Sequence, residues 1–146
     1  MPEPRPDAAI EALVEELLKS TGQLRRRLRA EANPSALSWS QTTVLSRLHK
    51  DGPSTTADLA RAEGVKPQSM GATLIALERD GLVERRPHAT DGRQSLYELT
   101  PLGTETRAQH RLLKRTWLAA AMTQLDAEEQ QALAIALRVI HRLGSA

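Results

Sequence analysis

The stretch from residue 65 to residue 100 constrains the fold of this 146-residue chain more than any other. Pro67 suits the first turn of a helix, where its missing N–H would have no intrahelical partner anyway. Side chains at helical spacing then predict a buried stripe formed by Met70, Thr73, Leu74 and Leu77. Gly81 stands where a helix C-cap is expected, because glycine takes the left-handed conformation freely.

Two short extended runs follow this helix at once, over residues 82–86 and 95–99. Between them lies a turn-rich tip, residues 87–93, which contains the step Asp91-Gly92. The pattern is typical of a hairpin with a charged tip. A helix followed directly by such a hairpin predicts the recognition helix and wing of a winged helix-turn-helix.

Two further helices are predicted before the recognition helix. Ser38 and Gln41 have the spacing of a capping box, which opens a helix that the Asp-Gly-Pro step at 51–53 ends. The next helix is expected to begin at Ser54 or Thr55 and to end at Gly64. Its inward face is predicted to consist of Leu59, Ala60 and Ala62.

Thr55 and Asp58 have the spacing of a second capping box at the start of this helix. Ser54 and Thr55 could instead donate hydroxyl bonds to DNA phosphates, although capping alone would explain both residues. A helix, a short turn with Gly64 and a second helix form the helix-turn-helix pattern.

The flanking segments predict helices at both ends of the chain. Residues 1–7 contain three prolines and are expected to form a flexible tail. An amphipathic helix to about Ala30, a long helix over 102–122 and a last helix over 127–143, capped by Asp126, complete the pattern. Their apolar positions include Ile10, Leu13, Leu17, Leu133, Leu137 and Ile140.

The predicted fold class is therefore mostly α with a small β-hairpin wing, a winged helix-turn-helix flanked by N- and C-terminal dimerisation helices. Residues 8–36 and 101–146 form the expected helical dimerisation region. Residues 37–100 form the expected winged helix-turn-helix DNA-binding domain. Apolar stripes on the terminal helices need a partner, and a two-fold homodimer is the simplest way to bury them.

Composition indicates an ordinary globular protein, with 40% hydrophobic and 26% charged residues. No apolar run is longer than that of residues 117–122, which is far too short to cross a bilayer. The N-terminus has no signal-peptide pattern, and cysteine is absent. These features favour a cytoplasmic location without a membrane partner.

The charge balance alone does not indicate a DNA-binding protein. The net charge is only +2 despite a pI of about 9.4. Residues 52–99 contain six basic and seven acidic side chains. This neutrality favours an alternative function, a winged-helix module that binds protein without binding DNA. The cluster Arg25, Arg26, Arg27 and Arg29 is either a solvated helical face or a contact to phosphate or an acidic partner.

An enzyme is not expected. The four histidines, His49, His88, His110 and His141, stand singly without metal-ligand spacing. The sequence contains no nucleophile elbow, phosphate loop or carboxylate pair in a supporting context. No catalytic residue, metal or cofactor is therefore predicted.

Three stretches together resemble the MarR family of transcription regulators. Residues 37–45 (LSWSQTTVL) are similar to the opening of that family's second helix, and residues 77–85 (LERDGLVER) to the end of its recognition helix. The DGR of 91–93 and the LTPLG of 99–103 are similar to its wing and the start of the next helix. In order and spacing, the resemblance covers about residues 8–144.

This resemblance implies a homodimer that binds palindromic double-stranded DNA, usually as a repressor. It also implies release from DNA by a small ligand, often aromatic or phenolic, between the dimer helices and the winged domain. Trp39 and Trp117 are either core residues or lining of such a pocket. The absence of cysteine excludes the branch of the family that senses peroxide through a reactive cysteine.

The resemblance also assigns roles to single residues. It puts Arg93 in the minor groove and makes Asp91 the acid that orients basic wing residues. Lys66 departs from the Ser or Thr that often caps the recognition helix. The positions implied to face the major groove are Pro67, Gln68, Ser69, Met70 and Thr73.

Residue chemistry supports several of these roles independently. Gln68 can contact adenine bidentately and Ser69 can serve either base type, whereas Met70 is expected in the core. Arg85 and Arg86 flank the wing as candidate DNA contacts, and one of them is expected to pair with Glu84 or Asp91. Gly71 either permits a close backbone approach or fits tight helix packing.

Overall fold

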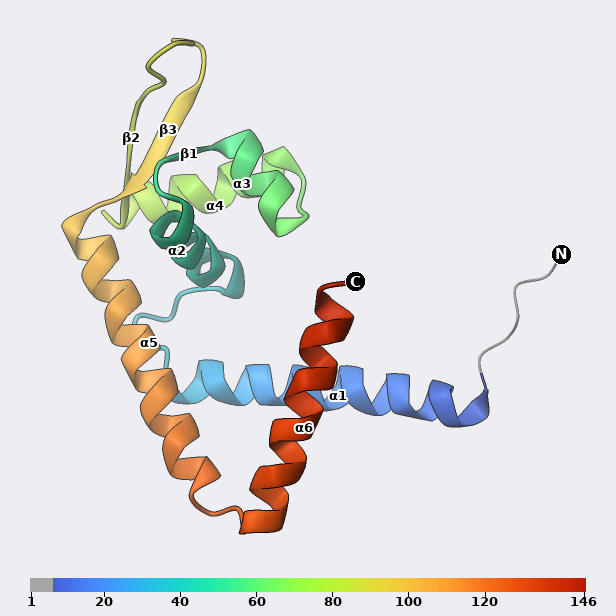
Figure 1. The fold of residues 1–146 in the computed structure, drawn as a ribbon. Helices are drawn as coiled ribbons and strands as arrows, with labels where there is room; N and C mark the ends of the chain where they lie inside the picture. Colours follow the sequence, from blue (N-terminus) through green and yellow to red (C-terminus); the bar gives the residue numbers. More distant parts are fainter. Residues whose placement is uncertain (1–6) are drawn as a thin grey trace, which may run out of the picture. The chain divides into compact units, whose positions relative to one another are not determined.

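A computed structural model describes residues 7–146, so all but the last residue of the predicted N-terminal tail lies outside the described residues (Figure 1). Helices dominate, and a small sheet lies near the middle of the chain. The elements are α1 (Ala8–Glu31), α2 (Trp39–Asp51), β1 (Ser54–Thr55), α3 (Thr56–Glu63), α4 (Pro67–Arg79), β2 (Val83–Pro87), β3 (Ser95–Leu99), α5 (Pro101–Met122) and α6 (Ala127–Gly144). The mostly α fold with a β-hairpin wing is confirmed.

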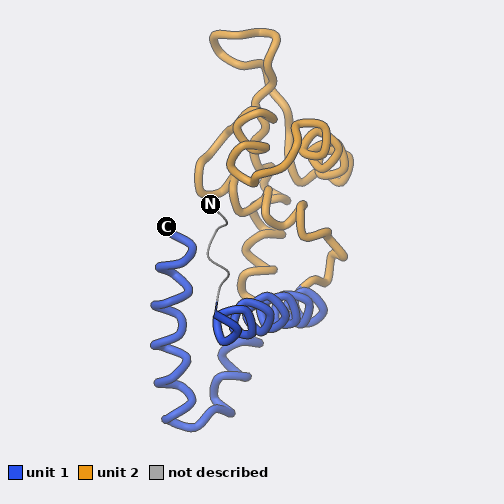
Figure 2. The backbone as a smooth tube through the Cα atoms, turned by 90° about the vertical axis from the view of Figure 1, so that its right-hand side faces the viewer, with its two compact units in different colours: residues 1–32, 113–146 blue, residues 33–112 orange. Residues whose placement is uncertain are grey.

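The chain divides into two compact units (Figure 2). The central unit is residues 33–112, and the terminal unit combines the described residues up to Ala32 with residues 113–146. The central unit thus extends further than the range 37–100 expected from sequence. It includes the first half of α5 because Gly103 packs against the Leu82 backbone, where a Cβ on Gly103 would lie within 1.9 Å of the carbonyl oxygen.

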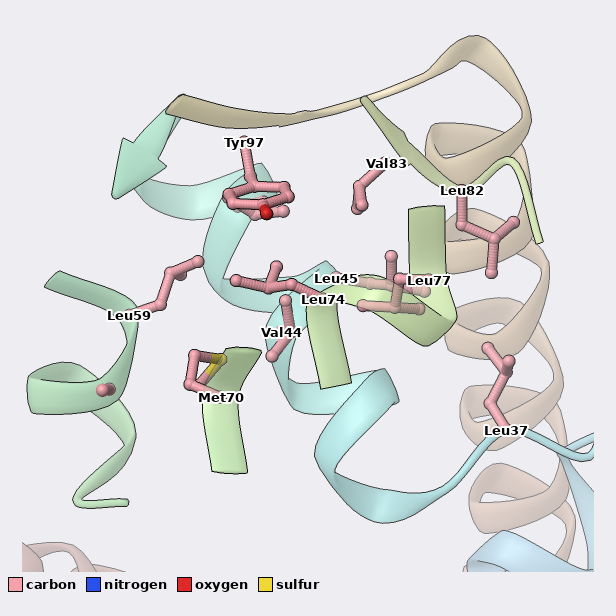
Figure 3. Packing of buried hydrophobic residues seen from close by; sticks show 12 residues of the cluster. Leu37, Val44, Leu45, Leu59, Met70, Leu74, Leu77, Leu82, Val83 and Tyr97 are labelled. Carbon is pink, nitrogen blue, oxygen red and sulfur yellow. The ribbon is translucent and has the colours of Figure 1, made fainter. Parts of the chain in front are cut away.

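The hydrophobic core of the central unit lies between α2, α3, α4 and the sheet (Figure 3). The recognition helix α4 contributes Met70, Leu74 and Leu77, as predicted, but Thr73 is only half-buried at the edge of this face. The other members are Leu37, Val44, Leu45, Leu48, Leu59, Ala60, Leu82, Val83 and Tyr97. Aliphatic side chains therefore hold α4 in place, with one aromatic ring above them.

A three-stranded antiparallel sheet has the order β1-β3-β2. β2 and β3 form the wing hairpin, with Val83 opposite Leu99 and Pro87 opposite Ser95. In Figure 1 this hairpin projects beyond the helices of the central unit. Strand β1 was missed by the sequence analysis: Ser54 and Thr55 pair with β3, and helix α3 begins only at Thr56.

Helix caps follow the sequence closely, with one exception. The capping box of Ser38 and Gln41 is confirmed by bonds of 2.8 and 3.1 Å. At α3 only half of the predicted box forms, because the Asp58 carboxylate pairs with Arg61 at 2.8 Å instead of returning to the cap backbone. Ala62, predicted to face inward, is exposed. Gly64 at the end of α3 is left-handed, with φ of 64°.

The terminal unit contrasts with this core. Neither α1 nor α6 has a buried residue. Within the unit, the Arg27 guanidinium lies 5.7 Å from the centroid of the Trp117 ring and pairs with Glu31 at 2.8 Å. The exposed apolar side chains include Ile10, Leu13, Val14, Leu17, Leu18, Ile135, Leu137, Val139 and Ile140. Among residues 7–146, no helix combines the length and the apolar composition that a membrane span requires.

Candidate nucleic-acid interface

The outer face of α4 is opposite its buried stripe. Four exposed side chains recur there at intervals of four, three and four residues, which places them on one ridge of the helix. We call this set the outer ridge: Gln68, Ala72, Ile75 and Arg79. The sequence analysis found only Gln68. The signal for the others was the same helical spacing on the face opposite the buried stripe.

The start of α4 matches its sequence. Pro67 occupies the first turn, and Lys66 is the N-cap without a side-chain bond to the helix, so this start is less well capped, as expected. Pro67, Gln68 and Ser69 are all exposed. Three neighbouring side chains of the first turn are therefore free to meet a ligand.

Ser69 and Thr73 lie at the edge of α4, to one side of the outer ridge. The Thr73 hydroxyl donates to the Ser69 carbonyl at 3.1 Å. A small cavity of about 90 Å³ lies beside them, lined also by Met70 and by Trp39 of α2. Trp39 is 45% exposed, so it is a rim residue and not a core residue. Trp117 is half-buried in the terminal unit.

An ion pair ties the end of α3 to α2 immediately before the turn into α4. Arg47 Nε donates to Glu63 Oε1 at 3.0 Å, and Arg47 also lies 3.7 Å from Asp51. The hydrogen bond to Glu63 raises the pKa of Arg47 above its ordinary value. Sequence reasoning missed this pair because sixteen residues separate its members.

Ser54 and Thr55 are buried, and their hydroxyls are used within the chain. Ser54 donates to the Gly52 carbonyl at 2.9 Å, and the Thr55 hydroxyl accepts from the Asp58 N–H at 3.1 Å. The local bonds account for both residues, which leaves little reason to assign them a phosphate contact.

Both wing arginines pair with acids, but not with the acids expected. Arg85 lies 3.6 Å from Glu78 at the end of α4, and Arg86 lies 3.6 Å from Glu98 on β3. The expectation of a pair with Glu84 or Asp91 was wrong, because the two arginines have carboxylate partners on α4 and on β3. Each arginine side chain stays more than half exposed and can still approach a phosphate.

The wing tip is held by hydrogen bonds from two side chains. Asp91 Oδ1 accepts from the Arg93 N–H at 3.1 Å. His88 Nδ1 accepts from the backbone N–H groups of Thr90 at 3.2 Å and Asp91 at 3.1 Å. Asp91 thus orients the Arg93 backbone, whereas we expected it to hold a guanidinium. His88, which looked isolated in the sequence, is a structural residue of the tip.

Ion pairing leaves three cations and three acids of residues 52–99 without an ion-pair partner. Four of the seven acids in residues 52–99 pair with arginines. Within the part of the chain that the structure describes, Lys66, Arg79 and Arg93 form no ion pair. These three exposed cations stand at the two ends of α4 and at the wing tip. No cluster of three or more metal-ligating side chains occurs among residues 7–146.

Known proteins share this combination of recognition helix and wing. A profile of the MarR family matches residues 37–95. An HTH-type transcriptional regulator of Mycobacterium bovis, itself uncharacterised, is 34% identical over 121 residues, which cover 83% of this chain and 85% of the relative. The chain belongs to the MarR family. This is a family of transcription regulators and not of enzymes.

Two solved structures show how closely the fold follows other regulators. A crystal structure of a candidate transcriptional regulator of Pseudomonas aeruginosa superimposes with a TM-score of 0.82 at 32% identity, covering 96% of this chain and 99% of that one. A mutant of MarR from E. coli, solved in complex with operator DNA, superimposes with a TM-score of 0.71 at 25% identity, covering 92% and 99%. The winged helix-turn-helix assignment of this MarR-family chain is thereby confirmed.

Proposed function

We propose that this MarR-family regulator is a homodimeric repressor that inserts α4 into the major groove and the wing tip into the adjacent minor groove. The observation that carries the proposal is the position of the uncompensated cations. Lys66 and Arg79 bracket α4, and Arg93 marks the wing tip, so the neutral bulk charge of the module does not oppose binding to phosphate.

The side chains of the first turn of α4 supply base readout. Gln68 is exposed and offers both an acceptor and donors, which suits adenine, while the Ser69 hydroxyl serves either base type. Pro67 fixes the direction of that turn. Thr73 lies at the edge of this surface, where its hydroxyl bonds to the Ser69 carbonyl. Arg85 and Arg86 contact phosphates from the wing stem. Arg93 enters the narrow minor groove, whose negative potential favours a guanidinium.

The homodimer follows from the unburied apolar faces of α1 and α6. Leu13, Leu17, Leu137 and Ile140 are all more than a third exposed in a single chain. A second copy covers such faces by two-fold symmetry and presents two recognition helices to a palindromic site. Analytical ultracentrifugation at micromolar concentration is expected to show a dimer. A folded monomer near 16.0 kDa as the sole species would contradict this assembly.

A gel-shift assay tests the DNA-binding function against the alternative of a protein-binding module. We expect full-length protein to shift DNA from upstream of its own gene, with an affinity that falls steeply as salt rises, because bound phosphates release counterions. Equal affinity for random DNA and upstream DNA, or no binding to either, would favour the protein-binding alternative. A regulator that binds an operator must reach chromosomal DNA, so the proposal includes a cytoplasmic location.

Regulation by a small aromatic or phenolic ligand is the remaining part of the proposal. Such a ligand releases DNA only if it binds a DNA-incompetent arrangement of recognition helices more tightly than the competent one. Trp39 and Trp117 are the only tryptophans, so their fluorescence reports on binding. We expect phenolic compounds that change this fluorescence to lower DNA affinity by the linked factor. Tight binding with unchanged DNA affinity would refute the mechanism.

A further inference from the structure

The outer ridge of α4 has an apolar centre. Ile75 is 56% exposed, although it sits on a helix whose buried stripe is filled by Met70, Leu74 and Leu77. Ala72 lies beside it, one turn towards the N-terminus. The ridge therefore runs from an amide, Gln68, through two apolar side chains to a cation, Arg79.

We propose that Ile75, together with Ala72, reads thymine 5-methyl groups in the major groove, so that Ile75 determines operator specificity. The inference rests on the proposed DNA-binding function and deepens it. Thymine alone displays a methyl group on the major-groove edge, and apolar side chains recognise it by excluding water. Burying one such group contributes about 0.8 kcal/mol, which corresponds to about four-fold in affinity.

The small area of the apolar centre favours DNA over a protein partner. Two side chains cover far less than the roughly 800 Å² per partner that a stable protein interface buries. The residues that flank them have the chemistry of groove contacts: Gln68 suits a base edge and Arg79 suits a phosphate. An apolar pair between two such residues matches the mixture of methyl and polar groups on the floor of the groove.

The spacing along α4 also predicts where the thymines lie. Seven residues separate Gln68 from Ile75, which is about 10 Å along a helix that rises 1.5 Å per residue. Base pairs are spaced by 3.4 Å per step. With α4 lying along the groove, the thymines read by Ile75 should lie about three base pairs from the base read by Gln68, towards the side contacted by Arg79.

Replacing thymine by deoxyuridine tests the proposal, because it removes the 5-methyl group and leaves base pairing intact. The probe is a duplex recovered from a randomised library by repeated binding to the full-length protein. Uridine is then introduced at one thymine at a time. We expect the wild-type protein to lose about four-fold in affinity at one or two positions per half-site and nothing elsewhere.

The variant Ile75→Ala identifies the side chain responsible. It should bind the thymine duplex about as weakly as the wild type binds the uridine duplex. It should no longer respond to uridine at the thymine that Ile75 contacts, whereas a thymine contacted by Ala72 alone should keep its response. Leu102→Ala is the matched control, since Leu102 is a 51% exposed apolar residue of α5 outside the outer ridge. This control should keep the full wild-type response.

Two outcomes would overturn the inference while leaving DNA binding intact. One is a recovered duplex that the wild-type protein binds equally well with thymine or uridine at every position. The other is an Ile75→Ala protein that responds to uridine as strongly as the wild type does. Recovery of no duplex at all would overturn the proposed function itself, so the two failures are distinguishable.

Discussion

The recognition helix and the wing tip both face outward from the central unit, yet they are held by different forces. Three side chains of α4, Met70, Leu74 and Leu77, are buried in the core. The wing tip has no such anchor: its backbone is fixed by hydrogen bonds to His88 and Asp91. Substitutions behind α4 should therefore affect the whole fold, whereas substitutions at the tip should affect DNA binding alone.

The largest expected effect comes from the core behind α4. Leu74 is fully buried, so Leu74→Ala leaves a cavity and should lower the free energy of unfolding by about 2–5 kcal/mol. Ile75→Ala, one residue along on the outer ridge, should stay within about 0.5 kcal/mol. Denaturant unfolding of the two variants measures the difference. Equal losses would show that α4 is not anchored on one face.

Arg93→Ala should show the opposite behaviour. Its side chain is exposed at the wing tip, so stability should hardly change. DNA binding should weaken by about 1–3 kcal/mol with a shallower salt dependence, because one cation is lost from the interface. Arg138→Ala, at an exposed position on α6, is the control for general loss of positive charge. A marked fall in melting temperature for Arg93→Ala would break the comparison between helix and tip.

The two side chains that organise the tip should have smaller effects. Asp91→Ala removes the acceptor for the Arg93 N–H, and His88→Ala removes the acceptor for two backbone N–H groups. Each should weaken DNA binding by about 0.5–1.5 kcal/mol. The double variant should lose less than the sum, since both residues hold one turn. If only the net charge mattered, Asp91→Ala would tighten DNA binding. That result would contradict the role of Asp91 in positioning the wing tip.

The comparison between helix and tip also shows what a sequence can predict. Most signals that act within one turn were reliable: the capping box at Ser38, the cap at Asp126 and the left-handed Gly64 all stand where expected, whereas the box at Thr55 forms only in half. The buried stripe of α4 followed from spacing alone, apart from Thr73 at its edge. Each of these features depends on residues close in the chain, which is why local physical chemistry sufficed.

Features that depend on distant partners were missed or wrongly paired. Strand β1 is two residues long and exists because β3 lies beside it. It is too short for an alternating pattern to predict it from the sequence. The partners of Arg85 and Arg86 come from α4 and β3, and tertiary geometry selects them over nearer residues in the sequence. The DNA contacts assigned by family resemblance, including Gln68, stay predictions, and the Arg93→Ala and Asp91→Ala variants test two of them.

The smallest expected effect concerns Gly71 of α4, where a substitution should stabilise the protein instead of weakening it. Beyond its chain neighbours and the adjacent backbone of α4, a Cβ at Gly71 would meet no described atom within 4 Å, so alanine fits without strain. Alanine also restricts the unfolded chain, and Gly71→Ala should raise the free energy of unfolding by about 0.4–1 kcal/mol. Gly103→Ala is the control, because its Cβ would collide with the Leu82 carbonyl and should destabilise the protein. Thermal unfolding measures both. A Gly71→Ala protein that unfolds more easily than the wild type would mean that α4 is not a regular, unstrained helix at this point, and the contrast with the wing tip would lose its basis.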